Sequence, residues 1–281
     1  MSADLRVWAW AGTDPGRRRD HNEDSFAADA ELGVVAVCDG IGGHKGGATA
    51  SRMAVQALVE AARGGPSAAA RRGAPGVAGR TTQPMIAVDA LPPRRRPAPP
   101  PPASPAAAAL RAAAARAARD IFEAGCDDPQ LAGMGTTLTA MWIRDDVAHG
   151  VHCGDSRAYH WRDGRLARLT EDHTWVAEQL RAGALRPDQV ATSPHRHVIT
   201  RSLGFEPTLD VDEFALPLSP GDGLLLCSDG ITNYVDDAEL GELTTRHGWA
   251  ALPALLVDLA NRRGGEDNIT VVTARVGNDA R

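Results

Sequence analysis

Short apolar runs that end at an acidic residue followed by glycine recur along the chain. Residues 34–38 are all apolar and precede Asp39 and Gly40, and residues 224–227 are apolar and lead through a serine to Asp229. A short apolar run bounded by glycine predicts a buried strand. Because a carboxylate at the end of a core strand needs a compensating charge, Asp39 and Asp229 become candidate ligands of a cation. An acidic turn after a strand is the ordinary alternative for a single Asp-Gly pair.

The pattern predicts antiparallel sheet in the second half of the chain. Short strands separated by tight turns are expected at residues 136–143, 147–153 and 158–161. Asp163-Gly164 has the composition of a hairpin turn. Residues 5–12 alternate well enough to form a first strand, and a last strand is expected near the C-terminus, over 269–276.

Two helices are predicted on either side of a long excursion. Residues 48–63 and 106–124 have helical composition and spaced apolar positions. Residues 64–105 between them are rich in proline, alanine, glycine and arginine, and such a segment buries too little surface to order itself. We therefore expect one domain over residues 1–281 with a disordered insertion at 64–105; a proline-rich ligand for a partner domain is the alternative. The polar, proline-bearing stretch 182–197 predicts a mobile surface flap.

Composition narrows the class of protein. The chain has 281 residues, of which 43% are hydrophobic, a formal net charge of -6 and a pI near 5.8, so we expect no nucleic-acid partner. No run approaches 18 apolar residues and no signal-peptide pattern opens the chain, so we expect a soluble cytoplasmic protein with no membrane partner. The four cysteines form no C-x-x-C pair, and we expect reduced core residues rather than a structural zinc or redox motif.

Four carboxylates occupy equivalent places at strand ends. Asp39 and Asp229 each follow a buried strand, Asp155 lies at the end of another, and Asp267 comes just before the last one. Oxygen ligands carried on a rigid sheet suit Mg²⁺ or Mn²⁺, and the Gly40 carbonyl adds one more. No histidine accompanies them in ligand spacing, which argues against zinc or a His-rich iron site. Two such ions, bridged by one Asp and a water, generate hydroxide near neutral pH for in-line attack on phosphorus.

A charged cluster near the N-terminus adds a second candidate group. Residues 17–25 read Arg-Arg-Arg-Asp-His-Asn-Glu-Asp-Ser, and a cluster of this kind is most often a solvated loop. The alternative is that Arg19, Glu23 and Asp24 converge, with the guanidinium gripping a phosphate and the carboxylates holding metal or metal-bound water. On the residues alone both interpretations stay open.

Eight short motifs then follow one another along the chain: Arg19-x-x-Asn22-Glu23-Asp24, Asp39-Gly40-Ile41-Gly42-Gly43-His44, Gly135-Thr136-Thr137, Gly154-Asp155-Ser156-Arg157, Thr170-x-Asp172-His173, Ile199-Thr200-Arg201-x-Leu203-Gly204, Ser228-Asp229-Gly230 and Asp267-Asn268-Ile269-Thr270. With these motifs the chain resembles the metal-dependent serine/threonine protein phosphatases of type 2C, in their compact bacterial form. Each motif is weak alone, but eight in family order, over nearly the whole chain, are a strong signal.

The resemblance implies an α+β fold and a metal centre. The fold is a four-layer α/β/β/α sandwich, in which two antiparallel sheets pack face to face with helices on both outer sides. By position, Asp39 bridges both ions, the Gly40 carbonyl binds one of them, and Asp229 and Asp267 hold the other. Asp155 matches the acid linked to a third, weaker metal, which it shares with Asp229. The implied cofactor is therefore two Mn²⁺ or Mg²⁺ ions, with a third weaker one.

The resemblance also implies roles in binding and catalysis. Arg19 grips the substrate phosphate bidentately, and Glu23 and Asp24 orient metal-bound waters. Residues 174–200 form the flap beside the site. The histidines have plainer interpretations: His152 and His160 lie on predicted strands and are expected to be packed or surface histidines rather than ligands, and His173 is expected to fix the turn after Thr170.

The chain departs from the family pattern in three places. A family glutamate after the glycine loop is replaced by Ala48. Where animal members carry a histidine proposed as general acid, this chain has Ile41, so a metal-bound water is expected to protonate the leaving alkoxide, with His44 as a more distant substitute. The insertion is longer than the compact form needs. None of these changes removes a metal ligand.

The function expected from the resemblance is hydrolysis of phosphoserine and phosphothreonine on proteins by direct attack of the metal-activated water, without a phosphoenzyme. The expected partners are phosphorylated substrates of a serine/threonine kinase, and possible substrates include the kinase itself; we expect a monomer. Two alternatives are a silent relative that binds phosphoproteins and a partner-switching phosphatase dedicated to one small regulator. Retention of Asp39, Asp229, Asp267 and Arg19 disfavours the first, and the lack of an attached sensor domain disfavours the second.

Overall fold

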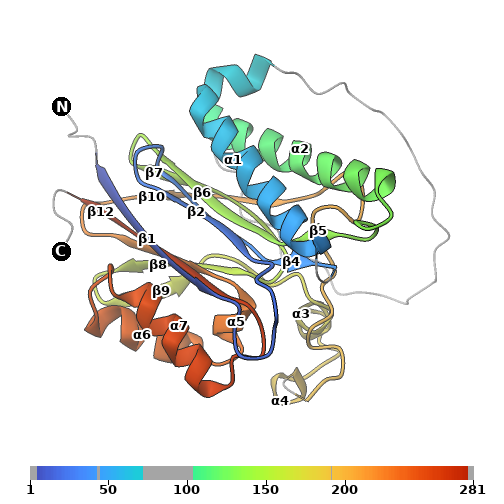
Figure 1. The fold of residues 1–281 in the computed structure, drawn as a ribbon. Helices are drawn as coiled ribbons and strands as arrows, with labels where there is room; N and C mark the ends of the chain where they lie inside the picture. The colour runs from blue at the N-terminus through green and yellow to red at the C-terminus, as the bar shows by residue number, and fades with distance from the viewer. Residues whose placement is uncertain (1–4, 43–44, 72–103, 191, 278–281) are drawn as a thin grey trace.

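The structure, a computed structural model, describes residues 5–42, 45–71, 104–190 and 192–277. In these residues two five-stranded antiparallel sheets lie face to face (Figure 1). The first sheet consists, in order, of β1 (Arg6–Asp14), β12 (Ile269–Gly277), β11 (Gly223–Cys227), β8 (Arg157–Arg162) and β9 (Arg165–Arg168). The second consists, in order, of β10 (Asp212–Pro217), β7 (Val147–Cys153), β6 (Leu138–Arg144), β3 (Val34–Cys38) and β2 (Ser25–Asp29).

Helices cover the outer face of each sheet, so the predicted four-layer α/β/β/α sandwich is confirmed (Figure 1). The second sheet is covered by α1 (Lys45–Arg71) and α2 (Pro105–Asp127). The first is covered by α5 (Asp229–Thr232), α6 (Asp237–Arg246) and α7 (Leu252–Arg263). None of the helices among the described residues combines the length and apolar character needed to cross a lipid bilayer.

Three hydrophobic cores separate the four layers. The core between the sheets joins Val35 and Met141 of the second sheet to Leu224 and Val272 of the first. The other two lie between each sheet and its helices. Strands β3 and β11 are interior strands of their sheets and are buried along their whole length. Burial on both faces explains why their sequences are continuous apolar runs rather than alternating ones.

The helix α2 starts where the predicted insertion was expected to end. The Ser104 hydroxyl accepts a hydrogen bond from the Ala107 N–H at 3.0 Å, and Pro105 occupies the first helical position. At the other boundary, α1 continues to Arg71 after a break at Gly65 (φ 70°). Helix α1 thus extends beyond residue 64, where the sequence predicted the disordered insertion to begin, and the insertion itself stays a prediction. Residues 72–103 of the predicted insertion lie outside the described residues.

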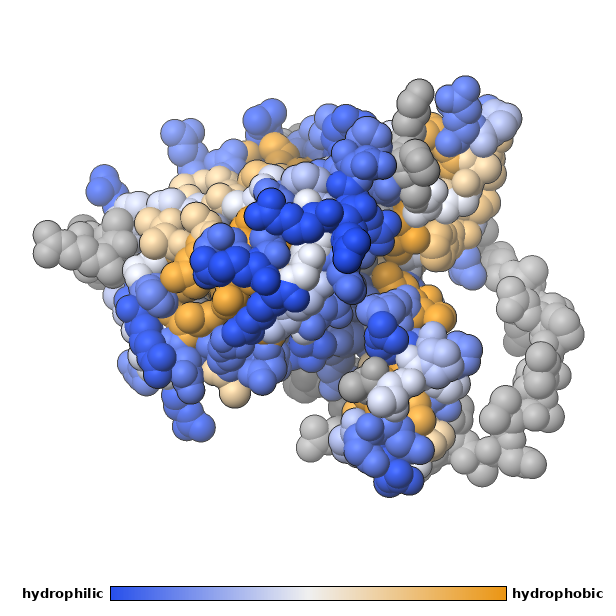
Figure 2. All heavy atoms as spheres, turned by 60° about the horizontal axis from the view of Figure 1, so that its bottom comes forward, coloured by the Kyte–Doolittle hydropathy of each residue, from blue (hydrophilic) through white to orange (hydrophobic). Residues whose placement is uncertain are grey.

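Two smaller features flank the end of the sandwich that lies away from the termini. A two-stranded pair is made by β4 (Gly40–Ile41) and β5 (Gly135–Thr136). Residues 174–200, called the flap from here on, contain α3 (Trp175–Arg181) and α4 (Pro187–Val190). The flap projects from the sandwich as a separate lobe (Figure 1, Figure 2).

Candidate metal centre

The strand ends that carry the predicted ligands meet at one end of the sandwich. Asp39 directly follows β3, Asp229 opens α5 just after β11, and Asp267 lies two residues before β12. The pair β4–β5 and α5 mark this end, opposite the chain termini (Figure 1). Because β11 and β12 are antiparallel neighbours in one sheet and β3 is an interior strand of the facing sheet, the strand ends place these acids at the same end of the sandwich.

Glycines permit the close backbone approaches at this end. A Cβ at Gly230 would lie 2.0 Å from the Asn268 carbonyl oxygen, so only glycine lets the start of α5 approach the start of β12. A Cβ at Gly40 would lie 2.4 Å from the Gly47 backbone and 2.5 Å from the Glu23 carbonyl oxygen. The glycine after Asp39 therefore serves packing against the loop that carries Glu23, and it leaves the backbone close to the acids.

The carboxylates act on one another electrostatically. Burial raises the pKa of Asp39 well above its ordinary value, and the charges of Asp24, Asp229, Asp155 and Asp267 raise it further. Burial, followed by the charge of Asp229, raises the pKa of Asp155 to about 8. Burial also raises the pKa of Asp229, with Asp267 the next cause. A protein holds several acids this close only when something compensates their charge.

Three buried carboxylate oxygens among the described residues have no hydrogen-bond partner: Asp24 Oδ1, Asp155 Oδ1 and Asp229 Oδ1. Unpaired buried carboxylate oxygens are costly for a protein and are the donors that Mg²⁺ and Mn²⁺ prefer. Among the residues that the structure describes, no group of three or more Asp, Glu, His or Cys side chains is placed to hold a single ion. The unpaired carboxylate oxygens fit hard cations in their chemistry.

Asp24 is held by a residue to which the sequence had assigned no role. The Ser228 hydroxyl donates to Asp24 Oδ2 at 2.9 Å and accepts the Thr270 N–H at 3.0 Å. Part of Asp24 reaches the surface, but its Oδ1 is out of contact with solvent, and burial raises the pKa of this carboxyl to about 7. Asp24 therefore belongs to the acidic cluster rather than to a solvated loop.

Asn268 is a second residue whose role was missed. Its Oδ1 accepts the Glu23 N–H at 2.8 Å, and its Nδ2 donates to the carbonyls of Pro15 and His21 at 3.0 and 2.9 Å. The side chain thereby fixes the loop that carries Glu23 and Asp24. Both Asn268 and Ser228 lie within the quoted motifs, directly beside predicted ligands, which was the available signal.

Arg19 lies at the rim of the cluster and contacts a predicted ligand. Its Nη2 donates to Asp267 Oδ2 at 2.8 Å, and the two side chains are 52% and 35% exposed. An ion pair this exposed is worth about 0–1 kcal/mol. Arg19 can therefore exchange Asp267 for another anion at small cost, and it reaches the solvent side where a substrate would arrive.

The backbone of Asp39 is fixed from the second sheet. Its N–H donates to Thr137 Oγ1 at 2.8 Å, and its carbonyl accepts the Thr137 N–H and the Thr136 hydroxyl, each at 2.9 Å. Ile41, next along the chain, is half-buried in β4. His44, the alternative proton donor, lies outside the described residues.

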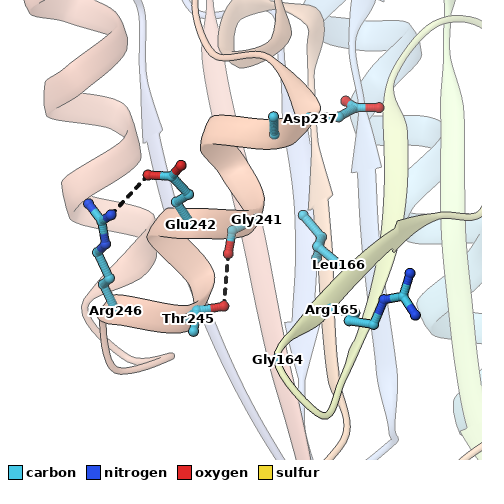
Figure 3. Close-up of a pocket in the computed structure, with 9 residues that line it drawn as sticks. Gly164, Arg165, Leu166, Asp237, Gly241, Glu242, Thr245 and Arg246 are labelled. Carbon is cyan, nitrogen blue, oxygen red and sulfur yellow. Dashed lines mark hydrogen bonds and ion pairs between the residues drawn. The ribbon is translucent and has the colours of Figure 1, made fainter.

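A surface hollow lies away from the acidic cluster. A hollow of about 520 Å³ opens between α6 and the hairpin that begins β9, with Leu166, Gly241 and Thr245 among its lining residues (Figure 3). None of the residues that line it belongs to the acidic cluster. We therefore assign the functional site from the chemistry of the carboxylates and not from the size of a cavity.

Known proteins resemble this chain over nearly its full length. The profile of the family described as protein phosphatase 2C matches residues 11–262. The serine/threonine phosphatase stp of Listeria monocytogenes is 33% identical over 264 residues, 92% of each chain. The serine/threonine protein phosphatase PstP of Mycobacterium tuberculosis is 34% identical over 270 residues, 95% of this chain and 44% of that protein. The crystal structure of the catalytic domain of PstP in complex with two manganese ions is 32% identical, covers 98% of this chain and 100% of that one, and superposes with a TM-score of 0.72.

Proposed function

The chain belongs to the protein phosphatase 2C family and is a metal-dependent serine/threonine protein phosphatase, and from this premise we propose the role of each site residue. Asp39 would be the ligand shared by two Mn²⁺ or Mg²⁺ ions, and the Gly40 carbonyl would bind one of them. Asp229 and Asp267 hold the other ion. The observation that carries this assignment is the burial of Asp39 among other carboxylates, whose charges raise its pKa, together with the unpaired buried Oδ1 of Asp229.

A third, weaker ion is proposed between Asp155 and Asp229. Asp155 is 9% exposed, its Oδ1 has no partner, and the charge of Asp229 is the chief electrostatic influence on it. Two carboxylates that repel each other in a buried place are stabilised when a cation lies between them.

The chain's own residues position the substrate. Arg19 binds two oxygens of the phosphoryl group and holds it in line, which it can do once it releases the exposed contact with Asp267. Glu23 and Asp24 accept hydrogen bonds from water at the ions, and Asn268 and Ser228 keep these two carboxylates in place. The bound ions supply Lewis acidity and a nucleophile derived from water, so the reaction needs no phosphoenzyme.

We propose phosphoserine and phosphothreonine on proteins as the substrates, with the products of a serine/threonine kinase, and the kinase itself, as the partners to test first. The supporting observation is that phosphatases of this substrate class are similar to the chain over nearly its full length. A single domain over 1–281, a monomer and a cytoplasmic location stay predictions from the sequence.

The assignment is tested by hydrolysis of an aryl phosphate and of a phosphothreonine peptide with Mn²⁺, with EDTA, and with Asp229→Ala. Asp258→Ala is the matched control, because Asp258 is an exposed aspartate paired with Arg262 on α7. We expect Mn²⁺-dependent hydrolysis by the wild type and by Asp258→Ala, and its loss in Asp229→Ala. If the Asp229→Ala variant releases as much phosphate as the wild type, the metal assignment is wrong.

A further inference from the structure

Two buried histidines lie behind the metal centre without a role in the mechanism above. His152 on β7 is 0% exposed and His173 is 1% exposed, and their ring centroids are 4.9 Å apart. Burial lowers the pKa of His152 to about 4, so its ring is neutral. Satisfied hydrogen bonds in a buried polar network make the groups that they join rigid. The hydrogen bonds of His173 connect it to Gly154 on one side and to the flap on the other.

In one direction His173 holds the residue before Asp155. Its backbone N–H donates to the Gly154 carbonyl at 2.8 Å, and its Nδ1 accepts the Gly154 N–H at 3.1 Å. Gly154 has a φ of +107°, and a Cβ there would lie 2.6 Å from Thr137 Cγ2. The Gly154 backbone is therefore held on both sides, and its conformation sets where the Asp155 carboxylate points.

In the other direction His173 holds both ends of the flap. Its carbonyl accepts the Thr200 N–H at 2.8 Å, where the flap returns to the body. The next residue, Thr174, pairs with Ile199, and the Trp175 N–H donates to the Val198 carbonyl at 2.8 Å. The two chain segments that connect the flap to the sandwich therefore lie side by side next to His173.

Asp212 completes the arrangement from the edge strand β10. Because Nδ1 of His173 accepts a hydrogen bond, its proton is on Nε2, which donates to Asp212 Oδ2 at 3.3 Å. Arg201, just after the flap, donates to Asp212 Oδ1 at 3.3 Å. The hydrogen bond from His173 lowers the pKa of Asp212, so this carboxyl is ionised at neutral pH.

We propose that His173 and Asp212 are positioning residues. They couple the position of the flap to the orientation of the Asp155 carboxylate. This inference rests on the proposed function in one respect, that Asp155 is a metal ligand. Binding of a cation at Asp155 fixes Gly154, Gly154 fixes His173, and His173 with Asp212 and Arg201 fixes the two ends of the flap.

Limited trypsin digestion tests this coupling without measuring activity. The flap offers two exposed cleavage sites, after Arg181 and after Arg196. In the wild type we expect saturating Mn²⁺ to slow cleavage in the flap. In Asp212→Ala we expect faster cleavage without metal and little protection by Mn²⁺. The change should be roughly three- to tenfold, the factor that one ordinary hydrogen bond accounts for, because the Asp212 side chain is 51% exposed. The isosteric Asp212→Asn, which keeps one acceptor, should shift in the same direction by less.

Glu213→Ala is the matched control. Glu213 is the next residue on β10 and pairs with one arginine, Arg111 of α2, at 3.0 Å. It should behave as the wild type does. Equal protection of the flap by Mn²⁺ in Asp212→Ala and Glu213→Ala, in protein whose wild type hydrolyses phosphothreonine peptide with Mn²⁺, would overturn the coupling alone. A wild type with no Mn²⁺-dependent hydrolysis would instead overturn the proposed function, so the two failures are distinct.

Discussion

Replacing Asp24 by asparagine should make the metal-free protein more stable, and by an amount that grows with pH. Burial raises the pKa of Asp24 from 3.8 to about 7 in the folded chain. A carboxyl whose pKa is raised by folding stabilises the native state below its unfolded pKa, and that contribution is lost as the pH rises through its folded pKa. The amide side chain of the variant would carry no proton to lose, and its oxygen can still accept from Ser228.

The size of this difference in unfolding free energy follows from the raised pKa of Asp24. Between pH 5 and pH 7 the native wild type keeps a proton that the unfolded chain has released, which costs about 1.4 kcal/mol per pH unit. Over this range the wild type should therefore lose about 2 to 3 kcal/mol of unfolding free energy relative to Asp24→Asn, the lower figure allowing for solvent screening at a residue that is partly exposed.

Urea unfolding in EDTA at pH 5 and pH 7, followed by tryptophan fluorescence, measures this difference. Asp258→Asn on the exposed face of α7 is the control and should follow the wild type at both pH values. Parallel curves for the wild type and Asp24→Asn across this pH range would refute the view that Asp24 is buried as an acid without a compensating charge.

Three other changes test separate parts of the site. Arg19→Lys keeps the charge but loses bidentate geometry, so kcat/KM should fall about tenfold while the melting temperature is unchanged, because the contact with Asp267 is exposed; an unchanged kcat/KM contradicts the role of Arg19. Gly47→Ala would place a Cβ 2.8 Å from the Gly40 carbonyl carbon and displace the Glu23 carboxylate, whose Oε2 would be 1.9 Å away. It should therefore lower both Mn²⁺-dependent kcat and the free energy of unfolding, the latter by about 1–3 kcal/mol in urea titration. Mn²⁺ affinity, measured by calorimetry, should rise from pH 6 to pH 8, because Asp155 has a pKa of about 8 and must lose its proton to bind; a flat profile contradicts this.

The sequence was informative about the site wherever a local pattern and a strand end coincided. Asp39 and Asp229 were predicted as ligands because continuous apolar runs end just before them, and the structure places both runs as buried interior strands of facing sheets. The roles of Ser228 and Asn268 were not predicted, since each depends on a hydrogen bond to a residue more than 200 positions away. A local pattern of apolar and polar residues does not show which residues so far apart in the sequence come into contact.

The same limit applies to the fold. The pattern predicted short antiparallel strands and two helices separated by an excursion, but not which strands pair, and not that α1 continues past Gly65. Nor did it predict the contact of Arg19 with Asp267, which depends on the opposite ends of the chain meeting. The layer order came from the family resemblance, because periodicity determines the face of an element and not its neighbour.

The pairing of β1 with β12 has a consequence for folding during synthesis on the ribosome. Strand β12 lies between β1 and β11, and its register with β1 runs from Arg6–Gly277 to Asp14–Ile269. Until residues 267–277 have emerged, β1 lacks the one strand with which it pairs in the described residues, Asp267 is absent from the cluster, and Glu23 lacks the Asn268 amide that fixes its loop. A nascent chain of this protein therefore carries no complete metal centre, and phosphatase activity can arise only when synthesis of the domain is finished.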